Sequence, residues 1–244
     1  MANLFEDLSN YVDKYGSYKY EETTDDCIFT ITLPKNKKEV ETDKYKDTTI
    51  LLDPGHGGMI DGVYQTAGKR SPDTWGPVYY EGVGNRDIVK RIMKGFDECG
   101  INYINLVPEE TDVPLDERTA RANTFAKSLS STIYQSVHSN GGGGTGFSVY
   151  TYIGQTSSDT YATVLYEEFQ KEFPEERIRT DYSDGDPDKE ANFWVLKHTA
   201  MPSLLSENFF MDTKADYELL MTETGRQRIA DCHIAAYKRI LKIK

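Results

Sequence analysis

The chain has 244 residues, of which 38% are hydrophobic, so it is long enough to bury the core of one large domain. Its formal net charge of -12 argues against broad electrostatic binding to nucleic acid or to an anionic membrane. No apolar stretch approaches the roughly 20 residues that a membrane-spanning helix requires. The first residues lack a basic segment followed by an apolar one, so we expect no signal peptide. The cysteines, Cys27, Cys99 and Cys232, are far apart and odd in number, which predicts free thiols rather than a disulfide framework.

The first part of the chain differs in character from the rest. Apolar residues recur at helical spacing over residues 4–15, and residues 27–33 have the composition of a strand. Residues 35–44 are nearly all polar or charged, which is typical of a solvated connector. We therefore expect residues 1–46 to form a small accessory segment and linker, and residues 47–244 to form the main domain.

In the main domain, apolar runs alternate with amphipathic segments. We expect strands from Ile50 onward and at 101–107, 133–138, 147–153 and 203–207, and helices at 85–99, 115–129, 160–173 and along 229–240. Strands that alternate with helices in this way build a layered α/β domain. The predicted fold is therefore a three-layer α/β/α domain with a mainly parallel mixed sheet, plus the short N-terminal accessory segment.

Two of the four histidines follow predicted strands directly. The apolar run from Ile50 breaks into Pro54-Gly55-His56-Gly57-Gly58, and the run from Ile133 ends in His138-Ser139-Asn140-Gly141. In α/β proteins the carboxyl ends of parallel strands share one edge of the sheet, where ligands bind. The repeated pattern predicts that both imidazoles bind a metal ion, although structural turn residues would show the same spacing.

Two carboxylates complete the candidate site. Two imidazoles and one carboxylate suit a catalytic zinc ion with one coordination position left for water, and Glu81 supplies the carboxylate. Glu207 ends an apolar run and would act as general base. Glu109, Glu110 or the acids near the 66–80 loop could replace Glu81, and Glu207 could instead cap a helix or pair with a cation.

The sequence resembles a known family, the zinc-dependent N-acetylmuramoyl-L-alanine amidases of the amidase 3 type. The resemblance covers residues 47–244 and rests on five stretches in the family's order. These are Leu52-Asp53-Pro54-Gly55-His56-Gly57-Gly58, Glu81 with Asn85, Leu115-Asp116-Glu117-Arg118 with Ala122-Asn123, Ser136-Val137-His138-Ser139-Asn140, and Met201-Pro202-Ser203-Leu204-Leu205-Ser206-Glu207-Asn208-Phe209-Phe210.

The resemblance implies that zinc is held by His56, Glu81 and His138 and that Glu207 is the catalytic carboxylate. The implied reaction is hydrolysis of the amide that joins N-acetylmuramic acid to L-alanine in bacterial peptidoglycan. We expect a monomeric phage lysin that stays in the host cytoplasm until lysis and then reaches the cell wall, with no nucleic-acid or membrane partner. The alternatives are an exported bacterial enzyme, a non-catalytic peptidoglycan-binding module, and a metal-dependent peptidase on the same scaffold.

The sequence departs from the family pattern at two places. Asp61-Gly62-Val63 is a looser counterpart of the usual Asp-x-Gly-Ala, and Phe209 stands where the family often has glycine. Some members carry an inhibitory helix after the second histidine, but the interval up to Glu207 is filled by ordinary predicted elements. We expect no such plug here. The loop Thr66–Tyr80, with its aromatic residues, is expected to shape the substrate groove.

For the other polar residues, the sequence either predicts a structural role or leaves the role open. His233 lies on the apolar face of the last predicted helix, which favours core packing, and Arg118 and Asn123 are expected to brace the fold. His198 is expected near the same end of the sheet as the site, where it could contact substrate or be merely solvated. The glycines at 141–144 could let backbone approach a glycan strand or form a loop without contacts.

Overall fold

In the computed structural model, residues 17–22, 27–32 and 47–243 are described. The chain divides into two compact units, residues 1–39 and 40–244. In the first unit, β1 (Ser17–Glu22) pairs antiparallel with β2 (Cys27–Thr32). The helix expected at 4–15 and the connector expected at 35–44 lie outside the described residues. The division of the chain at residue 46 therefore stays a prediction.

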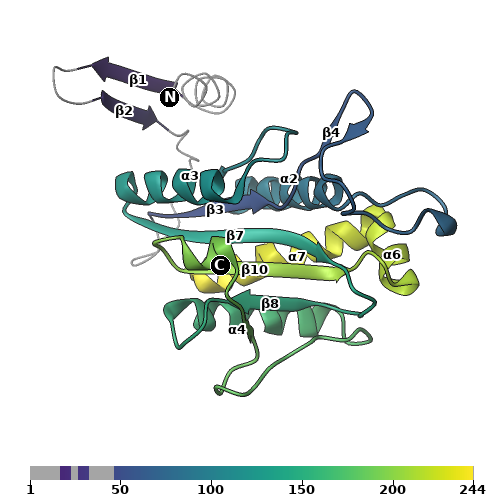
Figure 1. The fold of residues 1–244 in the computed structure, drawn as a ribbon. Coiled ribbons are helices and arrows are strands. Elements are labelled where there is room, and N and C mark those ends of the chain that lie inside the picture. The colour runs from purple at the N-terminus through teal and green to yellow at the C-terminus, as the bar shows by residue number, and fades with distance from the viewer. Residues whose placement is uncertain (1–16, 23–26, 33–46, 244) are drawn as a thin grey trace. The chain divides into compact units, whose positions relative to one another are not determined.

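The second unit is built on a six-stranded sheet with the order β6-β3-β7-β10-β8-β9 (Figure 1). Its strands are β3 (Thr48–Pro54), β6 (Asn102–Asn105), β7 (Ser131–Asn140), β8 (Ser148–Thr151), β9 (Lys189–Glu190) and β10 (Ser203–Phe210). The strands β6, β3, β7 and β10 are parallel to one another, whereas β8 runs antiparallel to β10 and β9 runs parallel to β8. The expected mainly parallel mixed sheet is confirmed.

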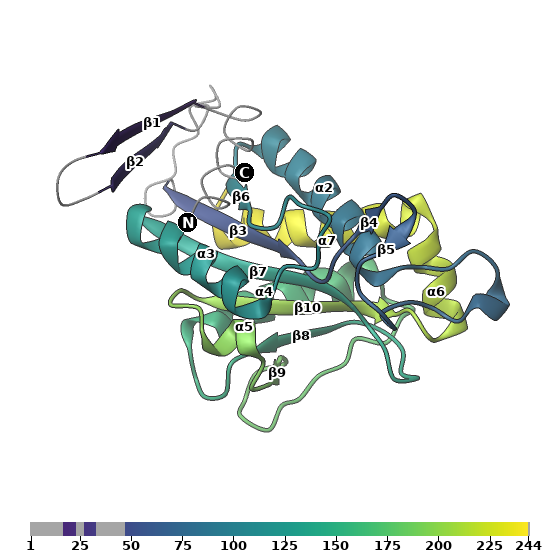
Figure 2. The same ribbon diagram turned by 45° about the horizontal axis from the view of Figure 1, so that its top comes forward.

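Helices cover both faces of this sheet (Figure 2). They are α2 (Glu81–Cys99), α3 (Leu115–Ser128), α4 (Ser157–Glu172), α5 (Trp194–Lys197), α6 (Lys214–Met221) and α7 (Glu223–Ile240). The helices α2, α4 and α7 pack together on one face, and α3 with α5 lies on the other. This arrangement confirms the three-layer α/β/α fold. None of the helices in the described part of the chain is long and apolar enough to span a bilayer.

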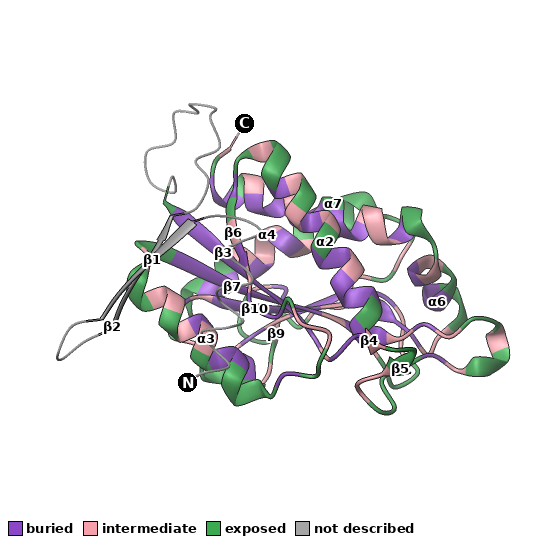
Figure 3. Ribbon diagram, turned by 90° about the horizontal axis from the view of Figure 1, so that it is seen from above, coloured by how far each residue is buried: buried purple, intermediate pink, exposed green. Residues whose placement is uncertain are grey.

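The core explains why these segments fold as they do. Every residue of β3 is buried, and Ile50, Leu51 and Leu52 have no exposed surface, as expected for a parallel strand covered on both faces (Figure 3). The helix α2 instead buries one stripe, which includes Ile88 and Phe96. It ends at Gly100, whose φ of 72° is the left-handed conformation that glycine adopts without strain.

Several smaller elements were not expected from the sequence. The residues after the first histidine form a hairpin of β4 (Met59–Ile60) and β5 (Val63–Tyr64), followed by a short 3-10 helix, η1 (Asp73–Trp75). Asp61 and Gly62 have φ values of 49° and 79°, the pattern of a two-residue type I′ turn. The departure Asp61-Gly62-Val63 therefore forms a tight hairpin turn. Cys99 and Cys232 are free thiols, as predicted.

Candidate metal centre

The turn that follows β3 holds His56 in an unusual backbone conformation. His56 has a φ of 65°, which is rare for a residue with a side chain. Two arginines stabilise this conformation through one carbonyl oxygen. Arg86 Nη1 donates to the carbonyl oxygen of His56 at 2.8 Å, and Arg118 Nη2 donates to the same oxygen at 3.1 Å. Arg118 also donates to the carbonyl of Pro54 at 2.8 Å. The expectation that Arg118 braces the fold is confirmed.

A buried carboxylate anchors Arg118 in turn. Asp53 accepts hydrogen bonds from Arg118, from the hydroxyl of Tyr134 and from Ser136 Oγ at 3.2 Å. Burial alone would raise the pKa of Asp53, but the charge of Arg118 and the Tyr134 hydrogen bond outweigh it, so the pKa is lower than usual. The pair is therefore charged, and it links the ends of β3 and β7 to the start of α3.

Gly55 allows the turn to pass directly over the second histidine. A Cβ atom at Gly55 would lie 2.1 Å from Cε1 of His138, well inside contact distance. The backbone here is also fixed, because Gly55 N donates to the carbonyl of Val137 at 2.9 Å and Asn85 Nδ2 donates to the carbonyl of Gly55 at 3.2 Å. The glycine is therefore required by the close approach of the backbone to the imidazole.

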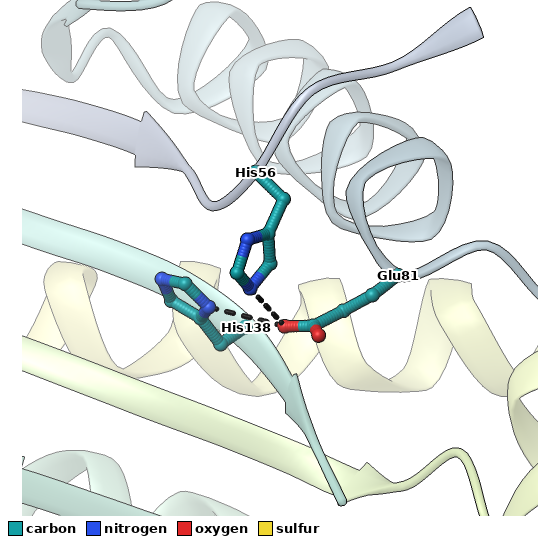
Figure 4. A group of neighbouring side chains, drawn as sticks. All are labelled: His56, Glu81 and His138. Carbon is teal, nitrogen blue, oxygen red and sulfur yellow. Dashed lines mark hydrogen bonds and ion pairs between the residues drawn. The ribbon is translucent and has the colours of Figure 1, made fainter. Parts of the chain in front are cut away.

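The structure brings His56, Glu81 and His138 together (Figure 4). Glu81 Oε1 lies 3.1 Å from His56 Nε2 and 3.1 Å from His138 Nδ1, and one potential ligand atom of each residue lies within 4.8 Å of the others. Glu81 is the first residue of α2, where the helix dipole favours a negative charge. Its side chain is 2% exposed, whereas those of His56 and His138 are 19% and 17% exposed.

The other carboxylates that could have replaced Glu81 are engaged elsewhere. Glu109 pairs with Arg121 at 2.5 Å, and Glu110 lies 3.6 Å from Arg86. Asp73, in the 66–80 loop, is exposed and lies 3.9 Å from Arg70. Of the acids considered, the structure places only Glu81 between the two imidazoles.

Two of the separations between donor atoms are close to those of a tetrahedral zinc site. Zinc–nitrogen and zinc–oxygen bonds of about 2.0 to 2.2 Å place neighbouring ligand atoms about 3.4 Å apart. The observed separations of 3.1 Å are close to that value. In addition, Glu81 Oε2 is buried without a hydrogen-bond partner. Burial alone would raise the pKa of Glu81, but the two imidazoles outweigh this effect and lower it, so the carboxylate is charged and available as a ligand.

Glu207 lies on the strand beside His138. The two residues are register partners in the parallel pair β10–β7, and both line a cavity of about 350 Å³ that also contacts Glu81. Burial and, secondly, repulsion by Glu81 raise the pKa of Glu207 to about 8. Glu207 Oε2 is buried without a partner, and within residues 47–243 its carboxylate forms neither a helix cap nor an ion pair. The strand continues to Phe210, so Glu207 does not end it as expected.

The backbone kinks immediately after Glu207. The register of β10 against β7 shifts between Glu207 and Phe210, and Phe209 has a φ of 65°. Glycine adopts this conformation without strain, whereas a residue with a side chain adopts it rarely. In this chain Phe209 is fully buried, and its ring centroid lies 5.0 Å from that of Phe173. Core packing therefore compensates for the strained conformation.

The cavity includes residues that sequence reasoning did not single out. Lys69 and Arg70 line it from the 66–80 loop, and Met211 and Asp212 line it from the segment after β10. The Thr66–Tyr80 loop lines the cavity, as expected, but it does so through Gly68, Lys69 and Arg70 and not through its aromatic side chains. Those side chains pack against the domain: Trp75 on Tyr217, Tyr79 onto the hydroxyl of Ser139 at 3.0 Å, and Tyr80 on Tyr64. The glycine-rich and basic part of the loop faces the cavity instead.

The glycine loop after β7 contributes backbone to the same cavity. Gly141 and Gly142 are among its lining residues. The amides of Gly142 and Gly143 both donate to Asp212 Oδ2, at 2.6 Å and 3.0 Å. A side-chain carboxylate therefore holds the loop to the end of β10.

The two remaining histidines lie away from this group. His198 precedes β10, and so lies beyond the opposite end of that strand from Glu207; the expectation that it shares an end with the site is wrong. Its ring stacks on Trp194 at 3.8 Å, and Asn123 Nδ2 donates to its carbonyl at 2.8 Å, which confirms a bracing role for Asn123. His233 is fully buried in the core, as predicted.

The chain is similar to several proteins of known function. The sequence profile of the family described as N-acetylmuramoyl-L-alanine amidase (Amidase_3) matches residues 50–239. The chain is 31% identical over 195 residues to the N-acetylmuramoyl-L-alanine amidase CwlM of Bacillus licheniformis, covering 80% of this chain and 69% of that protein. It is 27% identical to the endolysin of Bacillus phage SPP1, covering 80% of this chain and 66% of that protein. The crystal structure of an N-acetylmuramoyl-L-alanine amidase from Clostridium difficile 630 superimposes with a TM-score of 0.65 at 22% identity, covering 81% and 98% of the two chains.

Proposed function

Because this chain belongs to the Amidase_3 family of N-acetylmuramoyl-L-alanine amidases, we propose that it hydrolyses the bond between N-acetylmuramic acid and L-alanine with one zinc ion. Peptidoglycan amidase activity follows from the family; the zinc dependence and the roles of individual residues are our proposal. The observation that carries it is the convergence of His56 Nε2, His138 Nδ1 and the Glu81 carboxylate on one point beside a cavity.

The three converging residues would hold the metal, with the two imidazoles neutral and Glu81 charged. A zinc ion bound there supplies Lewis-acid polarisation of the scissile carbonyl and lowers the pKa of water to about 7. The protein keeps the ligands in place through groups that do not touch the metal. These include Arg86 and Arg118 on the carbonyl of His56. Such outer contacts orient ligands and so set the geometry of a metal site.

Glu207 is the proposed proton carrier. Its carboxylate would take a proton from the attacking water and deliver it to the nitrogen of the departing L-alanine. Burial raises the pKa of Glu207 above the usual value of a carboxyl group. A raised pKa suits both transfers, since the same group must be a base first and an acid afterwards. The absence of any protein partner for Glu207 Oε2 among the described residues leaves this oxygen available to water and substrate.

Lys69 and Arg70 are the proposed contacts for the acidic parts of the stem peptide. Both line the cavity, and Lys69 is close enough to Glu207 to lower its pKa. Arginine and lysine bind carboxylates through charge-assisted hydrogen bonds. We therefore expect them to orient the peptide side of the substrate, opposite the glycan.

We further propose that the enzyme acts as a phage lysin that remains in the host cell until lysis and then attacks the wall. The similarity to the phage SPP1 endolysin over 80% of this chain supports this role, whereas the similarity to the amidase CwlM of Bacillus licheniformis, over the same share of the chain, supports a bacterial enzyme. Expression inside a Gram-positive host separates the two. A lysin should stay cell-associated and lyse cells only after the membrane is permeabilised; activity in the medium of intact cells would contradict the lysin role.

The enzymatic proposal is tested with purified cell walls. The chelator-stripped protein should not clear the walls, and stoichiometric zinc should restore clearing together with new N-terminal alanine. Glu207→Gln should retain zinc but lose activity by about 10²-fold or more. Glu218→Gln, which alters an exposed acid 4.0 Å from Lys214, is the matched control and should behave as the wild type.

Other outcomes would support the rival functions. Zinc-independent clearing, or products with reducing sugar ends, would reject the amidase mechanism. Wall binding without any product would indicate a non-catalytic module, and cleavage within the stem peptide, detected by mass spectrometry of the released muropeptides, would indicate a peptidase.

A further inference from the structure

A second group of acidic side chains lies away from the proposed zinc site, in the loop between α4 and α5. Residues 181–190 read Asp-Tyr-Ser-Asp-Gly-Asp-Pro-Asp-Lys-Glu, so they carry five acids and one lysine. Most of these acids are exposed, and an exposed acidic cluster alone has no special meaning. Asp188 is different, because it is only 2% exposed.

Only one of the two carboxylate oxygens of Asp188 has a hydrogen-bond partner. Thr151 Oγ1, from strand β8, donates to Asp188 Oδ2 at 2.6 Å and fixes the orientation of the group. The other oxygen, Oδ1, is buried and has no hydrogen-bond partner. A buried carboxylate oxygen without a donor is energetically unfavourable, because it has lost its hydrogen bonds to water and has gained none within the protein.

A second unsatisfied carboxylate faces it. Asp186 also has a buried Oδ1 without a partner, while its Oδ2 accepts only a long hydrogen bond of 3.4 Å from Gln155 Nε2. The side chains of Asp186 and Asp188 are close enough to share a hydrogen bond, and the other charged group that acts on Asp188 is the acidic Asp159. Two carboxylates this close together repel each other strongly when both are ionised.

We propose that Asp186 and Asp188 bind a hard divalent cation, with Ca²⁺ as the expected ion. Calcium is bound by carboxylate and carbonyl oxygens in flexible loops, and it retains water where the protein offers few ligands. The two Oδ1 atoms supply anionic oxygens, and Thr151 orients one of them. A cation between the carboxylates would remove both the repulsion and the two unsatisfied oxygens. The site is independent of His56 and of the zinc proposal.

The structural role of the ion would be to fix the loop against the sheet. Thr151 ends β8, and the Asp186–Asp188 segment leads directly into β9, which pairs with β8 at Thr151 and Glu190. The strand β9 has only two residues, and hydrogen bonds such as that from Ala191 N to the carbonyl of Thr151 at 3.0 Å add to its hold on β8. Binding should therefore appear as a gain in stability rather than as a change in the chemistry at Glu207.

Calcium titration of the full-length, zinc-loaded protein tests the proposal. Isothermal titration calorimetry with CaCl₂ at about pH 7.5 should show one site, with a dissociation constant of about 10⁻⁴ to 10⁻³ M. CaCl₂ at about 10 mM should raise Tm by about 5 °C. Asp188→Asn should abolish both effects, and Asp186→Asn serves as a second variant should the first fail to fold. Asp184→Asn removes an exposed charge from the same loop and should keep both effects.

Each other result would overturn the proposal. An equal calcium effect in the wild type and in Asp188→Asn would place binding elsewhere, and its loss in Asp184→Asn would show diffuse electrostatics. The main rival is a proton shared by the two carboxyl groups, since burial and Asp186 raise the pKa of Asp188 to about 8. In that case calcium would have no effect, and wild-type stability would fall as the pH rises from about 4 to about 8, while Asp188→Asn would show no such fall.

Discussion

The buried imidazole of His233 predicts a loss of stability at mildly acidic pH that one substitution should remove. His233 has no exposed surface, Nε2 lies 3.2 Å from Asn208 Oδ1, and Nδ1 has no hydrogen-bond partner. Burial lowers its pKa from 6.5 to about 3. Below pH 6.5 the unfolded chain therefore binds a proton that the folded chain cannot accept. The free energy of unfolding must fall as the pH drops from 6.5 towards 3.

The size of the effect follows from these two pKa values. Between about pH 7 and pH 5, the folded state should lose about 2 kcal/mol, which lowers Tm by about 4 to 8 °C for a chain of this length. His233→Gln keeps a side-chain N–H for Asn208 but does not titrate. Urea unfolding of both proteins across this pH range measures the difference between their slopes, so that groups common to both cancel.

A control and a contrary result make this test decisive. His198→Gln alters an exposed histidine and should leave the pH dependence of the wild type unchanged. If His233→Gln loses as much stability between about pH 7 and pH 5 as the wild type does, His233 is not the group responsible. The assignment of a neutral, structural imidazole to this position would then be wrong.

Three further predictions concern the site and its supports. Gly55→Ala would place a Cβ atom 2.1 Å from the ring of His138, so we expect bound zinc, measured by atomic emission, to fall without loss of helical circular dichroism. Lys69→Met should move the acidic limb of the kcat/KM profile to higher pH, because Lys69 lowers the pKa of Glu207, and Lys69→Arg should leave it in place. Phe209→Ala should lower the free energy of unfolding by about 3 to 5 kcal/mol in urea titrations, since the ring is fully buried; a loss below about 1 kcal/mol would contradict its role in the core.

The parallel strands could be predicted from the sequence because burial on both faces leaves a continuous apolar run, as in Ile50-Leu51-Leu52. The start of α2 could not be placed the same way. The helix begins at Glu81, four residues before the expected start at 85. Its first turn holds two glycines and a single apolar residue, Val83, so the apolar periodicity does not extend to it. A Cβ atom at Gly82 would lie 1.9 Å from the carbonyl oxygen of Gly57. The first turn of α2 therefore packs against the loop that carries His56. A contact between segments so far apart in the chain leaves no helical periodicity in the sequence.

Some residues of the candidate site could likewise be predicted from the sequence, and others could not. The histidines were visible because each follows a predicted strand, and parallel strands end at a common edge. Lys69 and Arg70 were not, since they reach the cavity through a loop whose path is determined by distant contacts such as the hydrogen bond from Glu81 N to the carbonyl of Lys69 at 3.0 Å. Asp212 likewise acts by holding the amides of a remote glycine loop. Residues that a loop brings to the site can therefore be identified only from the structure.

The contacts around His56 show how the fold holds one residue of the candidate metal centre in place. A residue with a side chain in the left-handed region costs on the order of 1 to 3 kcal/mol and persists only when its surroundings enforce it. Here two guanidinium groups enforce it through one carbonyl oxygen, and one of them, Arg118, is itself fixed by the buried Asp53. Removing either charge of that buried pair would leave the other unpaired, so the pair is a rigid support rather than an adjustable one. The backbone that carries the imidazole of His56 is therefore held in place by the fold itself.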